Sequence, residues 1–134
     1  MTADELQAFF DQAGAPWVRD LGLRVTAAEP GDVHYELAVR PEQVHTGGVL
    51  CGQAIMAAFD TGMVLVMATL DATRMFTTVT LNSQFERGVP ADAGVARFHA
   101  WTTKPGRSLV FGQIDCLLPD GKRAATATTT YMWL

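Results

Sequence analysis

The chain has 134 residues, of which 49% are hydrophobic, so its length and composition fit one domain with a sizeable core. Its formal net charge is −4 and it has no basic run, which argues against a nucleic-acid partner. The 2 cysteines show neither a disulfide framework nor metal-ligand spacing, and no secretory leader is visible. We therefore expect a single cytoplasmic domain over residues 1–134.

The N-terminal part of the chain predicts one helix and two strands. Residues 2–13 carry hydrophobic side chains on one helical face and begin with Thr2 and Glu5 at capping-box spacing, which indicates an amphipathic helix. A glycine and a proline then end this helix. Residues 18–28 are a plausible strand, and the alternating hydrophobic residues of 33–39 indicate a half-buried strand after a Pro-Gly-Asp turn.

The stretch from His45 to Leu70 joins a glycine-rich loop to an apolar helix. Its second half is rich in Ala, Met and Leu and is apolar on nearly every face, which is typical of a buried helix. Between Glu42 and Asp71, the only acidic or basic residue is Asp60. Because polar residues divide the apolar run into pieces too short to cross a bilayer, we expect a core helix and no membrane partner.

After the helix, the pattern predicts strands at residues 76–86, 95–103, 108–118 and 123–133. Short turns join them, which favours antiparallel pairing. With the two N-terminal strands, the tally is about six. We expect an α+β fold in which one antiparallel sheet wraps around the long helix, with the short N-terminal helix packed on the sheet.

Asp60 is the first candidate for a functional residue. Its neighbours on the predicted helix are apolar. Burial of an unpaired carboxylate is costly, so such a group is retained when it is paired or used in catalysis. The sequence leaves two interpretations open: a catalytic carboxylate, or an Asp that reaches the helix edge or pairs with a basic residue of another strand.

The glycine loop is the second candidate. Gly48, Gly52 and the helix start could present free backbone N–H groups to a carbonyl oxygen, although a plain glycine turn has the same pattern. Cys51 lies where a thiolate is favoured, but a lone Cys among Val, Leu and Gly is more often an apolar filler. His45 is either a base or polarising group, or a structural loop residue.

The other polar candidates lie on strands and at turns. His34 and His99 have no metal-like spacing, and we interpret both as structural. Thr78 belongs to a polar strand face, for which solvation is the default interpretation. Arg107 is one of several basic residues beside turns, which could meet phosphates but are usually solvated.

The predicted order of elements resembles the hotdog fold, and the loop and helix resemble the PaaI-like acyl-CoA thioesterases. The family pattern is Asn-x-x-Gly-x-x-His-Gly-Gly, followed by a helix with Leu-x-Asp. This chain reads His-Thr-Gly-Gly-Val-Leu-Cys-Gly-Gln over residues 45–53, then Ala-Phe-Asp ending at Asp60. His45, Cys51 and Gln53 replace the family's Asn, His and second Gly. Further similar segments lie at residues 78–82, 85–87, 106–109 and 120–127.

The resemblance implies hydrolysis of an acyl-CoA thioester in a homodimer or a dimer of dimers, without a metal or another cofactor. Asp60, from the opposite subunit, would be the nucleophile or the general base, and the N–H of Gln53 beside Gly52 would polarise the carbonyl. Thr78 would orient the carboxylate or the water, and His45 would take the place of the family Asn. The acyl group would lie between the two central helices. The implied substrate-binding residues are Gly48, Cys51, Met56, Phe59, Met63 and Arg107.

Three other functions stay open at this point. A hotdog hydratase or dehydratase uses an Asp/His pair, which Asp60 and His45 could imitate. A non-catalytic acyl-CoA-binding module would fit the replaced family His and Gly. A structural partner domain would assemble through its strand edges. The apolar residues near Asp60 do not distinguish an aryl from an alkyl acyl group.

Overall fold

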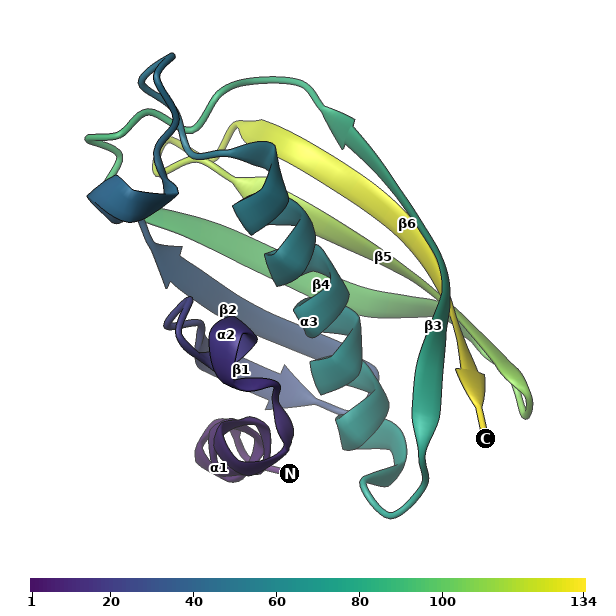
Figure 1. Ribbon diagram of the computed structural model, residues 1–134. Coiled ribbons are helices and arrows are strands. Elements are labelled where there is room, and N and C mark those ends of the chain that lie inside the picture. Colours follow the sequence, from purple (N-terminus) through teal and green to yellow (C-terminus); the bar gives the residue numbers. More distant parts are fainter.

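The computed structural model describes residues 1–134. Figure 1 shows a long helix lying against a curved sheet, with the two shorter helices beside it. The elements are α1 (Ala3–Ala13), α2 (Pro16–Arg19), β1 (Arg24–Glu29), β2 (Asp32–Ala38), the 3-10 helix η1 (Pro41–Gln43), α3 (Gly52–Asp71), β3 (Phe76–Phe85), β4 (Val95–Pro105), β5 (Leu109–Leu117) and β6 (Arg123–Trp133).

The strands form one antiparallel sheet of 6 strands in the order β1-β2-β4-β5-β6-β3. The helix α3 crosses its concave face, while α1 and α2 lie on the same side near β1 (Figure 1). Because β1 and β3 are the outermost strands, each has one edge without a partner strand. This sheet around a central helix is the hotdog arrangement, which confirms the α+β fold predicted from the sequence.

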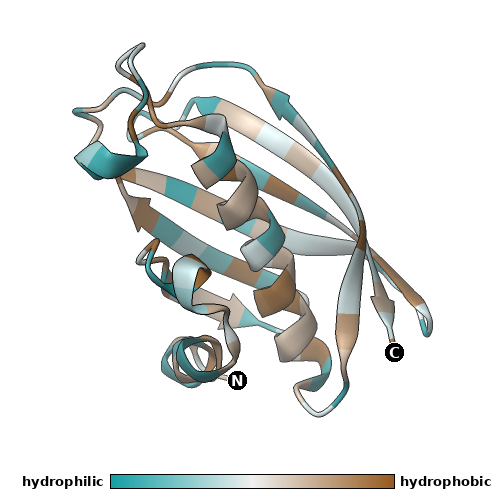
Figure 2. Ribbon diagram, viewed as in Figure 1, coloured by the Kyte–Doolittle hydropathy of each residue, from teal (hydrophilic) through white to brown (hydrophobic).

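The centre of the core is α3, of which 11 residues are buried. Hydrophobic and polar residues alternate along β2 and β4 (Figure 2), so that each strand presents one apolar face to the helix. Tyr35 of β2 stacks on Phe98 of β4, and its hydroxyl donates to the carbonyl oxygen of Ala58 at 2.6 Å. A Cβ at Gly62 would lie 2.0 Å from the Tyr35 hydroxyl oxygen, so only glycine permits this packing.

The helix α3 is also long and apolar enough, by composition alone, to span a membrane. Within the fold, however, 61% of its apolar 18-residue window is buried. Burial of this kind is what a core helix requires. The cytoplasmic location stays a prediction.

The N-terminal prediction is correct for the first helix and wrong for the beginning of the first strand. In α1, Thr2 and Glu5 form the predicted capping box. Residues 18–28 do not form one strand, because α2 occupies Pro16–Arg19 and β1 starts only at Arg24. Proline at the first helical position favours a helical turn, and Pro16 therefore explains why a helix forms where the strand was predicted.

Strand β3 contains an irregularity that the alternation pattern did not predict. Its pairing with β6 shifts register between Thr78 and Thr80. The extra residue, Val79, is 50% exposed, while Thr78 turns toward the helix and is half-buried. The bulge therefore reverses the predicted faces at this point, with the Thr directed inward and the Val outward.

Candidate active site

The carboxylate of Asp60 lies in the middle of α3 and is held by hydroxyl groups from two strands. The Thr78 hydroxyl of β3 donates to Asp60 Oδ1 at 2.9 Å. The Tyr131 hydroxyl of β6 lies 2.6 Å from the same oxygen and 3.0 Å from the Asp60 carbonyl oxygen. No Lys, Arg or His forms an ion pair with Asp60. Pairing with a basic residue of another strand of the same chain, one of the interpretations left open by the sequence, is therefore excluded.

Tyr131 is a site residue that the sequence analysis missed. Burial, followed by the charge of Asp60, raises the pKa of this phenol well above its usual range. The hydroxyl therefore stays protonated at neutral pH and can donate to the carboxylate. Tyr131 lies 71 residues after Asp60, on the inward face of β6, and only the β3–β6 pairing brings it and Thr78 to the same place. The alternation of buried and exposed residues along β6 was the only local signal that the Tyr131 side chain points toward the helix.

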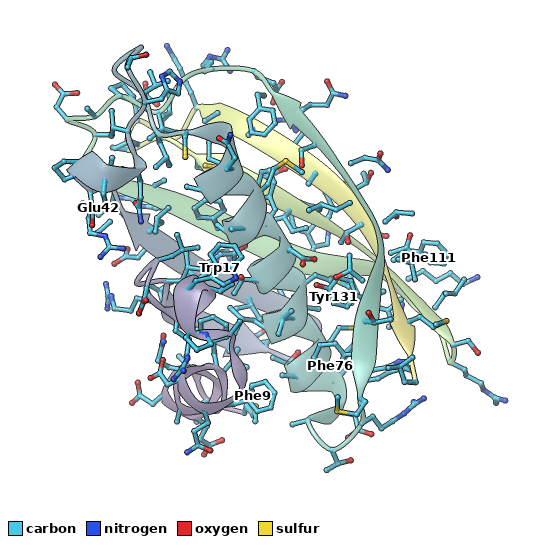
Figure 3. All side chains as sticks on the ribbon, in the orientation of Figure 1. Phe9, Trp17, Glu42, Phe76, Phe111 and Tyr131 are labelled. Carbon is cyan, nitrogen blue, oxygen red and sulfur yellow. The ribbon has the colours of Figure 1, made fainter.

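The Asp60 side chain is half-buried at the wall of an apolar groove. The groove has a volume of about 240 Å³ and lies between α3 and the two N-terminal helices. Trp17 of α2, which is 65% exposed, lines the groove. Its side chain extends from α2 beside α3 in the view of Figure 3. The carboxylate therefore faces a hydrophobic wall that is open to the outside, where it can meet an apolar ligand or a water molecule.

A second cavity, of about 290 Å³, lies at the start of α3. The glycine loop, with His45 and Gly52, forms one side, and the segment after β3, with Phe85 and Arg87, forms the other. Gly48 has a φ of +82°, a left-handed conformation that favours glycine and shapes the loop. The guanidinium of Arg87 is anchored by donation to the Arg123 carbonyl oxygen at 2.8 Å and supplies a cation to this cavity.

The start of α3 offers free hydrogen-bond donors to this region. The N-cap residue, Cys51, makes no side-chain cap. The first backbone donor bonded inside the helix is Ile55, so the N–H groups of Gly52, Gln53 and Ala54 have no protein acceptor. Since the helix dipole also favours negative charge here, the geometry suits a carbonyl oxygen that gains charge during a reaction. The Gln53 side chain itself is exposed.

The loop fixes the tautomer of His45. The N–H of Gly47 donates to Nδ1 of His45 at 2.8 Å. Because Nδ1 accepts this bond, the neutral ring carries its proton on Nε2. The exposed ring lines the cavity at the helix start, so Nε2–H is available to a ligand there.

Within one chain, the two halves of the predicted site are not brought together. Asp60 lies 8 residues after Gly52, a separation of about 12 Å along the helix, and each borders its own cavity. Arg107 is farther from the helix start than Asp60 is. It lies in the turn between β4 and β5, beside the Trp133 end of β6, whereas the cavity at the helix start borders the other end of β3.

The residues implied to bind the acyl group differ in their surroundings. Met56 is 38% exposed on α3. Phe59 and Met63 are fully buried in the core, Phe59 edge-on against Phe98 of β4, and neither lines a cavity. The apolar side chains of α3 that do line cavities are Ile55, at the helix start, and Ala57 and Val64, beside Asp60.

Asp60 has no metal-ligating neighbours, since the nearby polar groups are hydroxyls. A group of His and Asp side chains close enough to share a metal ion does occur elsewhere, at Asp32, His34 and His99 on the opposite face of the sheet. The sequence spacing gave no sign of it, because the pairing of β2 with β4 creates it.

The sequence profile of the thioesterase superfamily matches residues 47–125, more than half of the chain. The chain belongs to the thioesterase superfamily. The matched range contains Gln53, Asp60 and Thr78, while His45 and Tyr131 lie outside it. Membership in this superfamily supports hydrolysis of acyl thioesters as the general activity of the chain.

Solved structures show the same fold over almost the whole chain. A thioesterase family protein from Silicibacter pomeroyi has 24% identity and a TM-score of 0.85, covering 98% of this chain and 97% of that one. The PaaI protein from the phenylacetic acid degradation operon of E. coli has 12% identity and a TM-score of 0.86, covering 100% and 96%. A thioesterase from Haemophilus influenzae has 19% identity and a TM-score of 0.84, covering 100% and 91%.

No curated protein is a significant sequence match to the chain. The structural similarity confirms the hotdog fold, and with the superfamily match it agrees with the resemblance to PaaI-like thioesterases noted in the sequence.

Proposed function

We propose that this protein hydrolyses acyl-CoA thioesters to the free acid and CoA. The observation that carries the proposal is the carboxylate of Asp60, which has two hydroxyl donors and no cationic partner at the wall of an open apolar groove. A carboxylate placed in this way can act as a general base on water or as a nucleophile. The free N–H groups at the start of α3 supply the complementary part, a site for the carbonyl oxygen.

In the proposed reaction the thioester carbonyl points at the helix start, with the Gln53 N–H as donor. Asp60 either removes a proton from the attacking water or attacks the carbonyl itself. Thr78 and Tyr131 hold the carboxylate in position through their hydroxyls, and the Nε2–H of His45 donates to the carbonyl side of the substrate. As the tetrahedral intermediate collapses, the C–S bond breaks, and in the general-base route CoA leaves as its thiol with the proton that Asp60 removed from the water. Where Asp60 is the nucleophile, the CoA thiolate takes a proton from solvent, and a water molecule then hydrolyses the acyl–aspartyl anhydride to release the free acid.

The separation of the two halves within one chain supports a homodimeric site. Asp60 and the Gln53 N–H of the same helix are too far apart to act on one carbonyl, since reacting groups must approach to about 3–3.5 Å. The free edge of β3 suggests how a second copy meets the first, because Val79 and Phe85 of this strand are 50% and 51% exposed.

Antiparallel pairing of β3 with its copy would place the beginning of β3 in one subunit beside the end of β3 in the other. Thr78 and Asp60 lie toward the beginning of β3, and the cavity at the helix start borders its end. A twofold axis through the strand would therefore bring Asp60 of one subunit to the helix start of the other. The same operation would turn the β4–β5 turn with Arg107 toward the partner's cavity, and we propose that Arg107 and Arg87 meet the CoA phosphates there.

The test is a CoA-release assay with a thiol dye across short-chain, long-chain and aromatic acyl-CoAs. We expect release of free CoA with at least one of these classes. An enoyl-CoA that is converted to a hydroxyacyl-CoA without CoA release would instead identify a hydratase. Tight binding without release would identify a binding module, and no shift of Tm with any acyl-CoA would favour a structural partner domain.

A further inference from the structure

The convex face of the sheet carries a second group of reactive side chains, which the thioesterase proposal does not use. In the pairing of β2 with β4, His34 lies directly opposite His99. Asp32 precedes His34 by two residues on the same strand, so its side chain emerges on the same face. Tyr35, the next residue of β2, points the other way and bonds the helix α3. The group therefore lies on the face opposite the thioesterase site.

The three side chains converge on one point. Nε2 of His99 lies 3.1 and 3.0 Å from the two carboxylate oxygens of Asp32, and Nε2 of His34 lies 3.5 Å from one of them. Each residue offers one ligand atom such that all the ligand atoms lie within 4.8 Å of one another. Imidazole nitrogen and carboxylate oxygen atoms lie about 2.0–2.2 Å from a bound Zn²⁺, so ligand atoms this close to one another can share one ion.

Packing holds the group in place before any ion arrives. The His99 ring lies between the rings of His34 and Trp101, with centroid distances of 4.1 and 4.5 Å. The turn before Asp32 is fixed as well, because the Gly31 N–H donates to the Thr69 hydroxyl of α3 at 2.9 Å. Ligands held by their surroundings lose little conformational freedom on binding, which favours affinity.

The surroundings also suit a cation. Asp32 and His34 line an open cavity of about 290 Å³ that Glu29 borders as well. On β5, Asp115 pairs opposite His99 and adds a further carboxylate nearby.

We propose that Asp32, His34 and His99 bind one divalent transition-metal ion, such as Zn²⁺ or Co²⁺, on the convex face of the sheet. Nε2 of each imidazole and one carboxylate oxygen are the protein ligands, and water completes the coordination. Because a coordinating Nε2 carries no proton, each neutral imidazole in the bound state carries its proton on Nδ1. Two imidazoles and one carboxylate favour such ions over Mg²⁺ and Ca²⁺, which prefer oxygen ligands.

The test is titration of the untagged protein with Co²⁺, followed by visible absorption, and with Zn²⁺, followed by calorimetry. We expect one ion per chain in the wild type. His34→Gln and Asp32→Asn, which change partly exposed side chains, should weaken binding by about tenfold or more, because each removes one of the ligands. Mg²⁺ should not compete.

His45→Gln is the matched control, because His45 is the one histidine of the chain outside the proposed site and lies in the glycine loop. This variant should bind Co²⁺ as tightly as the wild type does. Binding in the glycine loop instead would use Cys51 and add a thiolate band in the near ultraviolet, which we do not expect in the spectrum of either protein. The proposal is overturned if the wild type binds no ion at millimolar Co²⁺, if His34→Gln binds equally well, or if the thiolate band appears. CoA release by His34→Gln should match that of the wild type.

Discussion

The two ends of the proposed reaction site are built in different ways. At the start of α3, the chemistry lies in the backbone, because the free N–H groups exist whatever side chains the first turn carries. At Asp60, the chemistry lies in side chains from three elements, α3, β3 and β6, that meet at one carboxylate. The first region should therefore tolerate side-chain substitution and fail when an N–H is lost, while the second should fail when a single functional group changes.

The largest effect is expected at the carboxylate. Asp60→Asn keeps the shape of the side chain and an oxygen that can accept from Thr78 and Tyr131, but it removes the base. We expect kcat to fall by about 10²- to 10⁴-fold in the CoA-release assay. Asp71→Asn is the matched control, because Asp71 ends the same helix and bonds only Thr73. Equal rates for Asp60→Asn and the wild type would remove Asp60 from the mechanism.

The next largest effect is expected from the loss of one backbone donor. Gln53→Pro removes the N–H at the second position of α3, where proline is compatible with the helix. We expect kcat to fall by about 10²- to 10³-fold. Gln53→Ala, which keeps the N–H and removes only an exposed side chain, should retain kcat. If the Pro variant folds with wild-type helicity by circular dichroism and keeps its kcat, the donor lies elsewhere.

Two buried tyrosines distinguish a role in positioning the Asp60 carboxylate from a role in the stability of the fold. Tyr131→Phe removes a donor to the Asp60 carboxylate, and the loss of one such bond should lower kcat by about 10- to 100-fold.

Tyr35→Phe removes a buried bond to the Ala58 carbonyl oxygen, whereas Tyr35 makes no hydrogen bond to the Asp60 carboxylate. It should lower the free energy of unfolding by about 1–3 kcal/mol in urea and leave kcat unchanged. If both variants lose the same stability and neither loses kcat, Tyr131 is a structural residue only.

The smallest effect concerns the rates at which the two cysteines react with a thiol reagent, and it does not involve enzyme activity. Burial raises the pKa of the Cys116 thiol to about 12, whereas Cys51 is partly exposed at the helix start. A thiol reagent should therefore modify one cysteine quickly in the native protein and both after unfolding. Acyl-CoA should slow the modification of Cys51, as judged by mass spectrometry. Labelling of Cys116 before Cys51 would contradict the placement of these residues.

The sequence predicted the features whose signals are local. The long apolar helix, the glycine loop before it and the capping box of α1 each lie in one continuous segment, and all were found. Tyr131 was not, because its link to Asp60 depends on β6 lying beside β3. The bulge at Val79 also escaped, since alternation along β3 assigns Thr78 to the polar face. Likewise, His34 and His99 are 65 residues apart in sequence and meet only through strand pairing.

Burial was the other limit on prediction. Phe59 and Met63 are apolar and close to Asp60 in sequence, which suggested a pocket lining. They point into the core instead, because the sheet covers that side of the helix. Val64, which lies one turn after Asp60 and toward α1, borders the groove. The sequence alone does not say which side of an all-apolar helix the sheet covers.

The central claim is that Asp60 of one subunit acts with the helix start of another. The most direct test is co-expression of Asp60→Asn and Gln53→Pro chains, each inactive alone. If the site is shared, every hybrid dimer has one site free of both changes, so random assortment should restore about one quarter of wild-type activity. A mixture no more active than its two parents would show that both groups act within a single chain, and would contradict the claim.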